Sequence, residues 1–166
     1  RFAYTKVSGK EFSKYDVDLD RIQQGKDPRT TVMVRNLMGA HARESMMQFL
    51  ERFGLGKRYT FFYMPCKERK KTPTGFAFIN FKEPCDVSKL YTSMKAGAWY
   101  HVITSWTGKG PEVSYARVQG HDELASHFRS SAVLHEWDPS KRPIFKNEAP
   151  GKQVYSPKDE RNNTCW

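Results

Sequence analysis

The chain has 166 residues, the usual size of one domain with extensions. Hydrophobic residues make up 38% of it and aromatic residues 14%, which excludes a disordered chain. The formal net charge of +10 favours a polyanionic partner, such as a nucleic acid or an acidic lipid surface. A basic surface that is only solvated is an equally good interpretation of the charge alone.

The cysteines Cys66, Cys85 and Cys165 stand far apart and form no C-x-x-C motif. This pattern predicts neither a disulfide framework nor a metal site, and it favours a reducing compartment inside the cell, the nucleus or the cytoplasm. No apolar run approaches the roughly 18 residues of a membrane helix. Because the chain opens on Arg1 and not on methionine, we expect that a preceding segment was trimmed, removed by processing or left out of this sequence. An organelle is the alternative compartment if that segment was a targeting signal.

The first part of the chain predicts an extension followed by regular structure. Residues 1–29 are polar, with one helical turn suggested by Leu19 and Ile22. Residues 30–37 alternate and are β-branched, which predicts a strand. An amphipathic helix is expected over 43–53, where apolar residues recur at helical spacing. An aromatic strand is expected over 59–66.

A basic loop at 67–74 leads into a third alternating strand at 75–81. A helix is expected from Pro84 to about Gly97, because proline suits the first helical turn. An extra extended segment is expected over 99–106, and the last strand over 112–118.

The chain after that strand predicts a third helix at 121–131, with Leu124 and Phe128 one turn apart. Beyond Leu134 the sequence is rich in proline, glycine, asparagine and lysine, which indicates an irregular tail. The sequence therefore predicts four units: an extension at 1–29, the domain at 30–120, a packed C-terminal helix at 121–134 and an irregular basic tail at 135–166.

The order strand–helix–strand–strand–helix–strand predicts an α+β fold, the ferredoxin-like sandwich. In this arrangement two helices cover one face of a four-stranded antiparallel sheet. The other face is left for a ligand, unless the C-terminal helix lies across it.

Residues 74–81, T-G-F-A-F-I-N-F, match the RNP1 pattern of RNA recognition motifs at all fixed positions but two. Thr74 replaces the basic first residue and Ile79 replaces valine. Because side chains alternate along a strand, Phe76 and Phe78 are expected on the open face, where they stack unpaired bases. Each stacked base contributes about 1–3 kcal/mol.

The segment 32–37, V-M-V-R-N-L, resembles RNP2 and is expected to pair with the RNP1 strand. Its second position is usually aromatic, and here it is Met33, which stacks less well. The expected partner is single-stranded RNA. The residues expected to contact it are Phe76, Phe78, Met33, Arg35, Tyr63, Asn80, Lys70, Lys71 and Arg117.

Several segments of the chain carry a resemblance to one known family: 18–22 and 25, 29–36, 59, 61–63 and 65, 75–81, 115–120, 127–128, and 142–144. Together they resemble the C-terminal RNA recognition motif of Mei2-like RNA-binding proteins. The resemblance implies the RNA recognition motif fold and RNA binding, and it implies that methionine is normal at position 33. The chain departs from the family at 37–40, L-M-G-A, where a Pro-Asn-Lys-type turn is usual.

An enzyme is not expected, because the five histidines are scattered and no nucleotide-binding fingerprint is complete. No cofactor, metal, small-molecule substrate or membrane partner is expected. The main alternative is a protein-interaction module, or a structural subunit of a large ribonucleoprotein with the sheet face covered. Exposure of Phe76 and Phe78 decides between the two.

Overall fold

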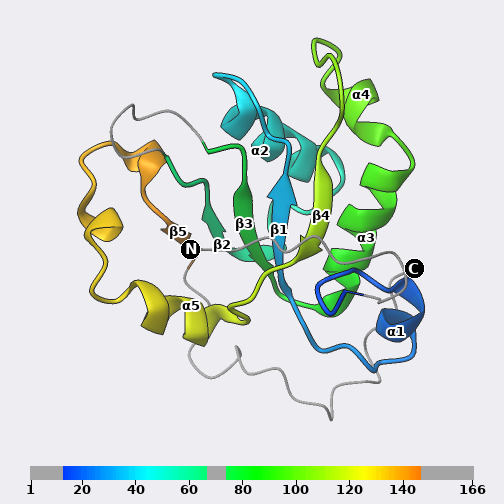
Figure 1. The fold of residues 1–166 in the computed structure, drawn as a ribbon, viewed down its shortest axis with the longest axis horizontal. Coiled ribbons are helices and arrows are strands. Elements are labelled where there is room, and N and C mark those ends of the chain that lie inside the picture. Colours follow the sequence, from blue (N-terminus) through cyan, green and yellow to red (C-terminus); the bar gives the residue numbers. More distant parts are fainter. Residues whose placement is uncertain (1–12, 67–73, 147–166) are drawn as a thin grey trace.

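A five-stranded antiparallel sheet runs through the molecule in the strand order β4-β1-β3-β2-β5 (Figure 1). The structure is a computed structural model and describes residues 13–66 and 74–146. The strands are β1 (Thr31–Arg35), β2 (Tyr59–Tyr63), β3 (Ala77–Phe81), β4 (Glu112–Tyr115) and β5 (Ile144–Phe145). The first four strands form the predicted α+β sheet and have the predicted positions.

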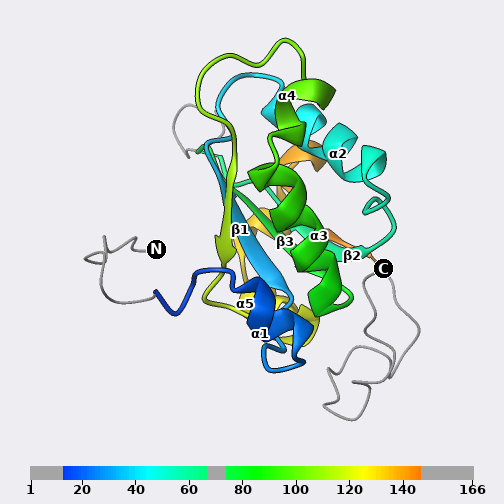
Figure 2. The ribbon, with the colours of Figure 1, turned by 90° about the vertical axis from the view of Figure 1, so that its right-hand side faces the viewer.

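The helices are α1 (Leu19–Gln23), α2 (Ala42–Arg52), α3 (Pro84–Lys95), α4 (Ala98–Val102) and α5 (His121–Phe128). Two 3₁₀ turns follow α5, at Ala132–His135 and Pro139–Lys141. Viewed along the sheet, α2, α3 and α4 lie on one side of it (Figure 2). The main hydrophobic core fills the space between these helices and the sheet.

The spacing of apolar residues explains why α2 and α3 pack where they do. Met46, Phe49 and Leu50 of α2 are fully buried against the sheet. Helix α3 begins with Pro84 and carries a capping box, in which Glu83 N donates to Asp86 Oδ2 at 3.0 Å. These local signals place both helices on the same face, as the sequence predicted.

The prediction of an extended segment over 99–106 is wrong in its first half, because Ala98–Val102 forms helix α4. Gly97 has φ 78 and ends α3, so the chain turns and starts a second short helix. Trp99 is 1% exposed and its ring lies 5.3 Å from that of Phe49. Burial of this tryptophan on the helical side outweighs the strand propensity of the segment.

The tail predicted as irregular beyond Leu134 contains a short strand, β5, in the part that the structure describes. Residues Ile144–Phe145 pair with the free edge of β2, with Phe145 opposite Phe61 and Ile144 opposite Phe62. The edge of β2 offers unpaired backbone groups, and a short segment is enough to satisfy them. A two-residue strand is too short to show alternation in the sequence.

Candidate nucleic-acid interface

The RNP1 strand divides its side chains between two environments. Ala77 and Ile79 are 0% exposed and belong to the main core under the helices. Phe78 belongs to a second, smaller cluster on the opposite face. The alternation predicted for β3 is confirmed. Phe78 stands between Met33 of β1 and Tyr63 of β2, which are its partners across the sheet.

Helix α5 covers the β2 side of this face. The ring of Phe128 stacks on Phe61 with centroids 5.6 Å apart and meets Tyr63 edge-on at 5.4 Å. Leu124, one turn earlier, is 4% exposed in the same cluster. As a result Phe61, Tyr63 and Phe78 are 0%, 8% and 4% exposed. The alternative in which the C-terminal helix lies across the sheet is therefore correct for this part of the face.

Phe76 lies just before the first residue of β3 and remains uncovered, with 37% of its surface exposed. Gly75 precedes it with φ 97, a conformation that residues with a side chain rarely adopt. The carbonyl of Gly75 accepts a hydrogen bond from Leu37 N at 2.9 Å, which ties this end of β3 to the chain leaving β1. The local backbone therefore fixes Phe76 at the free end of the face.

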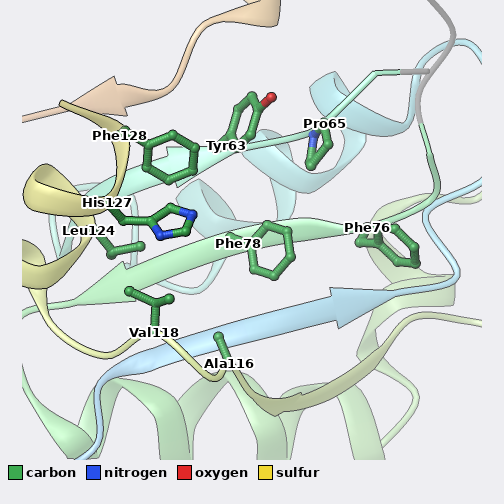
Figure 3. Close-up of a pocket in the computed structure, with 9 residues that line it drawn as sticks. All are labelled: Tyr63, Pro65, Phe76, Phe78, Ala116, Val118, Leu124, His127 and Phe128. Atoms are coloured by element: carbon green, nitrogen blue, oxygen red, sulfur yellow. The ribbon is translucent and has the colours of Figure 1, made fainter. Parts of the chain in front are cut away.

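A pocket of about 500 Å³ lies between the exposed end of β3 and helix α5 (Figure 3). Its volume falls in the range of small-molecule and cofactor sites. The walls are mostly apolar and come from β2, β3, the chain after β4, and α5. The lining residues are Tyr63, Pro65, Phe76, Phe78, Ala116, Val118, Leu124, His127 and Phe128.

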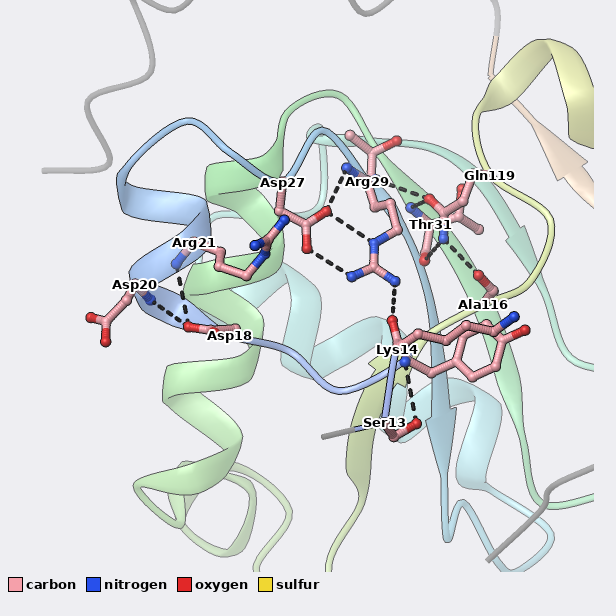
Figure 4. Close-up of polar contacts among 12 residues, drawn as sticks. Ser13, Lys14, Asp18, Asp20, Arg21, Asp27, Arg29, Thr31, Ala116 and Gln119 are labelled. Atoms are coloured by element: carbon pink, nitrogen blue, oxygen red, sulfur yellow. Dashed lines mark hydrogen bonds and ion pairs between the residues drawn. The ribbon is translucent and has the colours of Figure 1, made fainter. Parts of the chain in front are cut away.

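Gln119 fixes the point at which the chain leaves β4 and enters α5. Its Oε1 accepts from the backbone N of Thr30 and Thr31 at 3.1 and 2.9 Å. Its Nε2 donates to the carbonyls of Thr31 and Ala116 at 2.8 and 2.7 Å. Figure 4 shows this amide between β1 and the start of α5. Both polar atoms of the Gln119 side-chain amide are fully hydrogen-bonded, so the point at which α5 starts to cross the sheet is fixed.

The N-terminal extension is held by Arg29 (Figure 4). Its guanidinium pairs with Asp27, with Nη2 to Oδ2 at 2.8 Å, donates to the carbonyl of Lys14, and lies 3.9 Å from the ring centre of Tyr115. Burial opposes ionisation of Asp27, but the hydrogen bonds from Arg29 prevail and lower the pKa of the carboxyl. Burial raises the pKa of Tyr115 well above its usual value. Residues 13–29 of the extension are thus part of the folded domain.

The other predicted contacts lie around this surface. Met33 is half-buried beside Phe78. Arg35 Nη2 lies 3.0 Å from Glu112 Oε2 on β4, so its charge is already paired. A hydrogen bond from Lys109 is the main reason why the pKa of Glu112 is lowered. Arg117 is exposed and follows Ala116, which lines the pocket.

The side-chain amide of Asn80 is buried in a hydrogen-bond network. It is 3% exposed; its Oδ1 accepts from the hydroxyls of Thr30 and Thr31 at 2.8 and 2.7 Å, and its Nδ2 donates to Thr60 Oγ1 at 2.8 Å. We therefore remove it from the set of expected contacts, because no face of its amide is open to RNA. Lys70 and Lys71 lie outside the described residues.

The sequence interpretation missed the pocket residues supplied by the chain around α5. The sequence predicts that Leu124 and Phe128 form the apolar stripe of a helix, but it does not show which surface of the domain this stripe packs against. His127 and Val118 were not considered as part of the interface. The signal was present in the i, i+4 spacing of Leu124 and Phe128, because a short amphipathic helix after the last strand needs an apolar surface.

Among residues 13–66 and 74–146, no cluster of three or more histidine, cysteine or acidic side chains could hold a metal ion. No helix in that part of the chain is both long and apolar enough to cross a membrane.

Comparison with known proteins identifies the domain. Residues 29–129 match the family RNA recognition motif 2. Protein MEI2-like 2 of Oryza sativa subsp. japonica is 33% identical over 132 residues, 80% of this chain and 15% of that protein. Protein MEI2-like 4 of Arabidopsis thaliana is 31% identical over 142 residues, 86% of this chain and 15% of that protein.

Meiosis protein mei2 of Schizosaccharomyces pombe is 33% identical over 162 residues, 96% of this chain and 21% of that protein. The chain therefore spans only between 15% and 21% of these three relatives. The family is a binding domain and not an enzyme, and the resemblance to Mei2-like proteins is confirmed. The chain belongs to the RNA recognition motif 2 family, a family of RNA-binding domains.

Proposed function

We propose that the chain binds single-stranded RNA at the free end of β3 and in the pocket beside it. The observation that carries this proposal is the position of Phe76. Phe76 is 37% exposed at one wall of a pocket of about 500 Å³, although α5 covers the neighbouring aromatic residues. An exposed ring beside an open, mostly apolar pocket is a stacking surface for a base.

The bases must be unpaired for this geometry to work. A base in a duplex is stacked on both faces, and its edge is paired, so it cannot enter a pocket without leaving the helix. The pocket has walls on the sheet and on α5, and a base inserted between them is enclosed on more than one side (Figure 3). We therefore expect the domain to prefer single strands over duplexes of the same sequence.

Basic side chains near the pocket are suited to the phosphates. Arg117 is exposed beside the pocket residues Ala116 and Val118. The loop that contains Lys70 and Lys71 joins β2 to β3, and its described ends meet where Thr74 N donates to the carbonyl of Pro65 at 3.0 Å. Pro65 itself lines the pocket. These cations would contribute affinity that falls with salt and does not depend on the base.

Fluorescence anisotropy with a labelled pool of short single-stranded RNAs tests the proposal. Phe76→Ala should weaken binding by about 1–3 kcal/mol, the value of one stacked base. Tyr100→Ala is the matched control, because Tyr100 is an aromatic residue that is 44% exposed on α4. Circular dichroism would first show that both variants are folded.

Unlabelled duplex RNA added as a competitor separates single-stranded binding from general affinity for polyanions. The proposal expects the duplex to compete poorly at moderate salt. Equal competition by single strand and duplex, or unchanged affinity in Phe76→Ala, would show that phosphate contacts alone account for binding.

A second candidate function, a protein-interaction module, is favoured by one observation. Trp137, between the two 3₁₀ turns, is 92% exposed. Exposed tryptophans are enriched at the centre of protein interfaces. If the wild type binds no RNA in the anisotropy experiment, this candidate becomes the better explanation of the surface.

A further inference from the structure

The pocket contains an imidazole that packing does not explain. His127 projects from α5 into the space above Phe78 (Figure 3). Its side chain is exposed, and its ring meets that of Phe128 edge-on with centroids 5.0 Å apart. Within the described part of the chain, no hydrogen bond or ion pair engages its ring nitrogens. The polar atoms of His127 are therefore available to a ligand.

The apolar residues of the pocket cannot distinguish one base from another. Phe76, Phe78, Leu124 and Phe128 offer apolar surface, and every base has a face that stacks on such surface. Selectivity in pockets of this kind comes from a small number of well-placed polar groups. The polar side chains of the lining are those of Tyr63 and His127.

Tyr63 is the weaker candidate of the two. It is 8% exposed, and Phe128 meets its ring edge-on at 5.4 Å. In Figure 3 its hydroxyl points away from Phe78, whereas the imidazole of His127 points toward it. An imidazole can donate or accept a hydrogen bond, depending on its tautomer, and so it can read either kind of base edge.

We infer that His127 selects the base that enters the pocket, by hydrogen bonding to the edge of that base. The inference rests on the proposed function and assigns base selection to α5 instead of to the strands. Leu124 and Phe128, both packed on the sheet, hold the helix on either side of His127. Gln119 fixes the start of the helix. The backbone that carries His127 is therefore held in place before a base arrives, which lowers the ordering cost of recognition.

The test is selection from a pool of randomised single-stranded RNAs about eight nucleotides long, a length typical of a single-strand site. The bound and free fractions are sequenced, and the readout is the enrichment of the preferred base over the least preferred one. His127→Phe keeps a flat ring in the pocket and removes the hydrogen-bonding atoms. His101→Phe on α4 is the matched control, since His101 is exposed and does not line the pocket.

We expect His127→Phe to bind the pool within about twofold of wild type, and its base preference to fall by about threefold to tenfold, the effect of one hydrogen bond. His101→Phe should keep the wild-type preference. A preference unchanged in His127→Phe, or absent from the wild type, overturns the inference.

Phe76→Ala, measured in parallel, separates the two proposals. If that variant loses affinity while His127→Phe keeps its preference, only the role of His127 fails. If the wild type binds none of the pool, both proposals fail.

Discussion

The two faces of the sheet differ in how their aromatic and aliphatic side chains are used. On the helical face, Val32, Val34 and Ile79 are 0% exposed under α2, α3 and α4. On the other face, α5 covers the β2 side and leaves Phe76 exposed at the free end of β3. The same alternation along β3 thus places core residues on one side and the proposed ligand surface on the other. Variants that affect one face only can test this division.

Ile79→Ala should have the largest effect on stability. Ile79 is fully buried on the helical face, so truncation leaves a cavity and should lower the free energy of unfolding by about 2–5 kcal/mol. RNA affinity, measured at a temperature where the variant is folded, should stay within about twofold of wild type. Urea denaturation gives the first quantity and anisotropy the second. A large loss of affinity in the folded variant would mean that the two faces are not independent.

Asp27→Asn should have an intermediate effect that depends on pH. Asp27 is 3% exposed and bonded to Arg29, so loss of its charge should destabilise the domain by about 1–3 kcal/mol at neutral pH. The pKa of the folded carboxyl lies below the ordinary 3.8, so its contribution is present above that pH and is lost as the pH falls through the folded value. The difference between wild type and variant should therefore shrink in acid.

Thermal unfolding at neutral pH and below pH 3.8 would measure this difference. Asp20→Asn on the exposed side of α1 is the control. A difference that grows in acid would contradict the assigned role of Asp27.

Gln119→Ala should destabilise α5, the helix that covers part of the sheet, more than it destabilises the domain as a whole. The variant removes the hydrogen bonds from Gln119 to β1 and to Ala116, and we expect a loss of about 1–2 kcal/mol in unfolding free energy. Hydrogen exchange should become faster in α5 while β1 and β3 stay protected. Gln23→Ala, on the exposed surface of α1, should change neither. Unchanged exchange in α5 would show that Leu124 and Phe128 alone fix the helix.

The sequence predicts the sheet and its two main helices well, because the relevant signals are local. Alternation in 75–81 and the helical spacing of Met46, Phe49 and Leu50 are each visible within one element. Segment α4 was missed because Trp99 gains its burial from Phe49, a contact far away in sequence. Strand β5 was missed because a two-residue pairing leaves no periodic pattern.

The site was predicted in part for a related reason. The RNP1 pattern points to Phe76 and Phe78. Their different exposure depends on where α5 lies, and local sequence patterns do not give that position. Asn80 was misjudged because its partners, Thr30, Thr31 and Thr60, come from two other segments. Distant contacts therefore decide which residues of the predicted motif remain exposed.

Phe76→Ala should have a much smaller effect on stability than Ile79→Ala, about 1 kcal/mol, because Phe76 is 37% exposed and only part of its apolar surface is buried. Ile79→Ala should instead cause a large loss of stability, although the two residues are only three positions apart. Urea denaturation of both variants under the same conditions would compare them directly. A large destabilisation by Phe76→Ala would indicate that Phe76 is part of the core and not a free surface.

The most direct test of the account is an NMR titration of the domain with a short single-stranded RNA, followed through the backbone amides. We predict that the largest shift changes occur at Gly75, Phe76 and Phe78 and along α5 around His127. The amides of α2 and α3 on the opposite face should change little. Changes concentrated on α2 and α3, or none near Phe76, would contradict the claim that the free end of β3 and the pocket beneath α5 bind RNA.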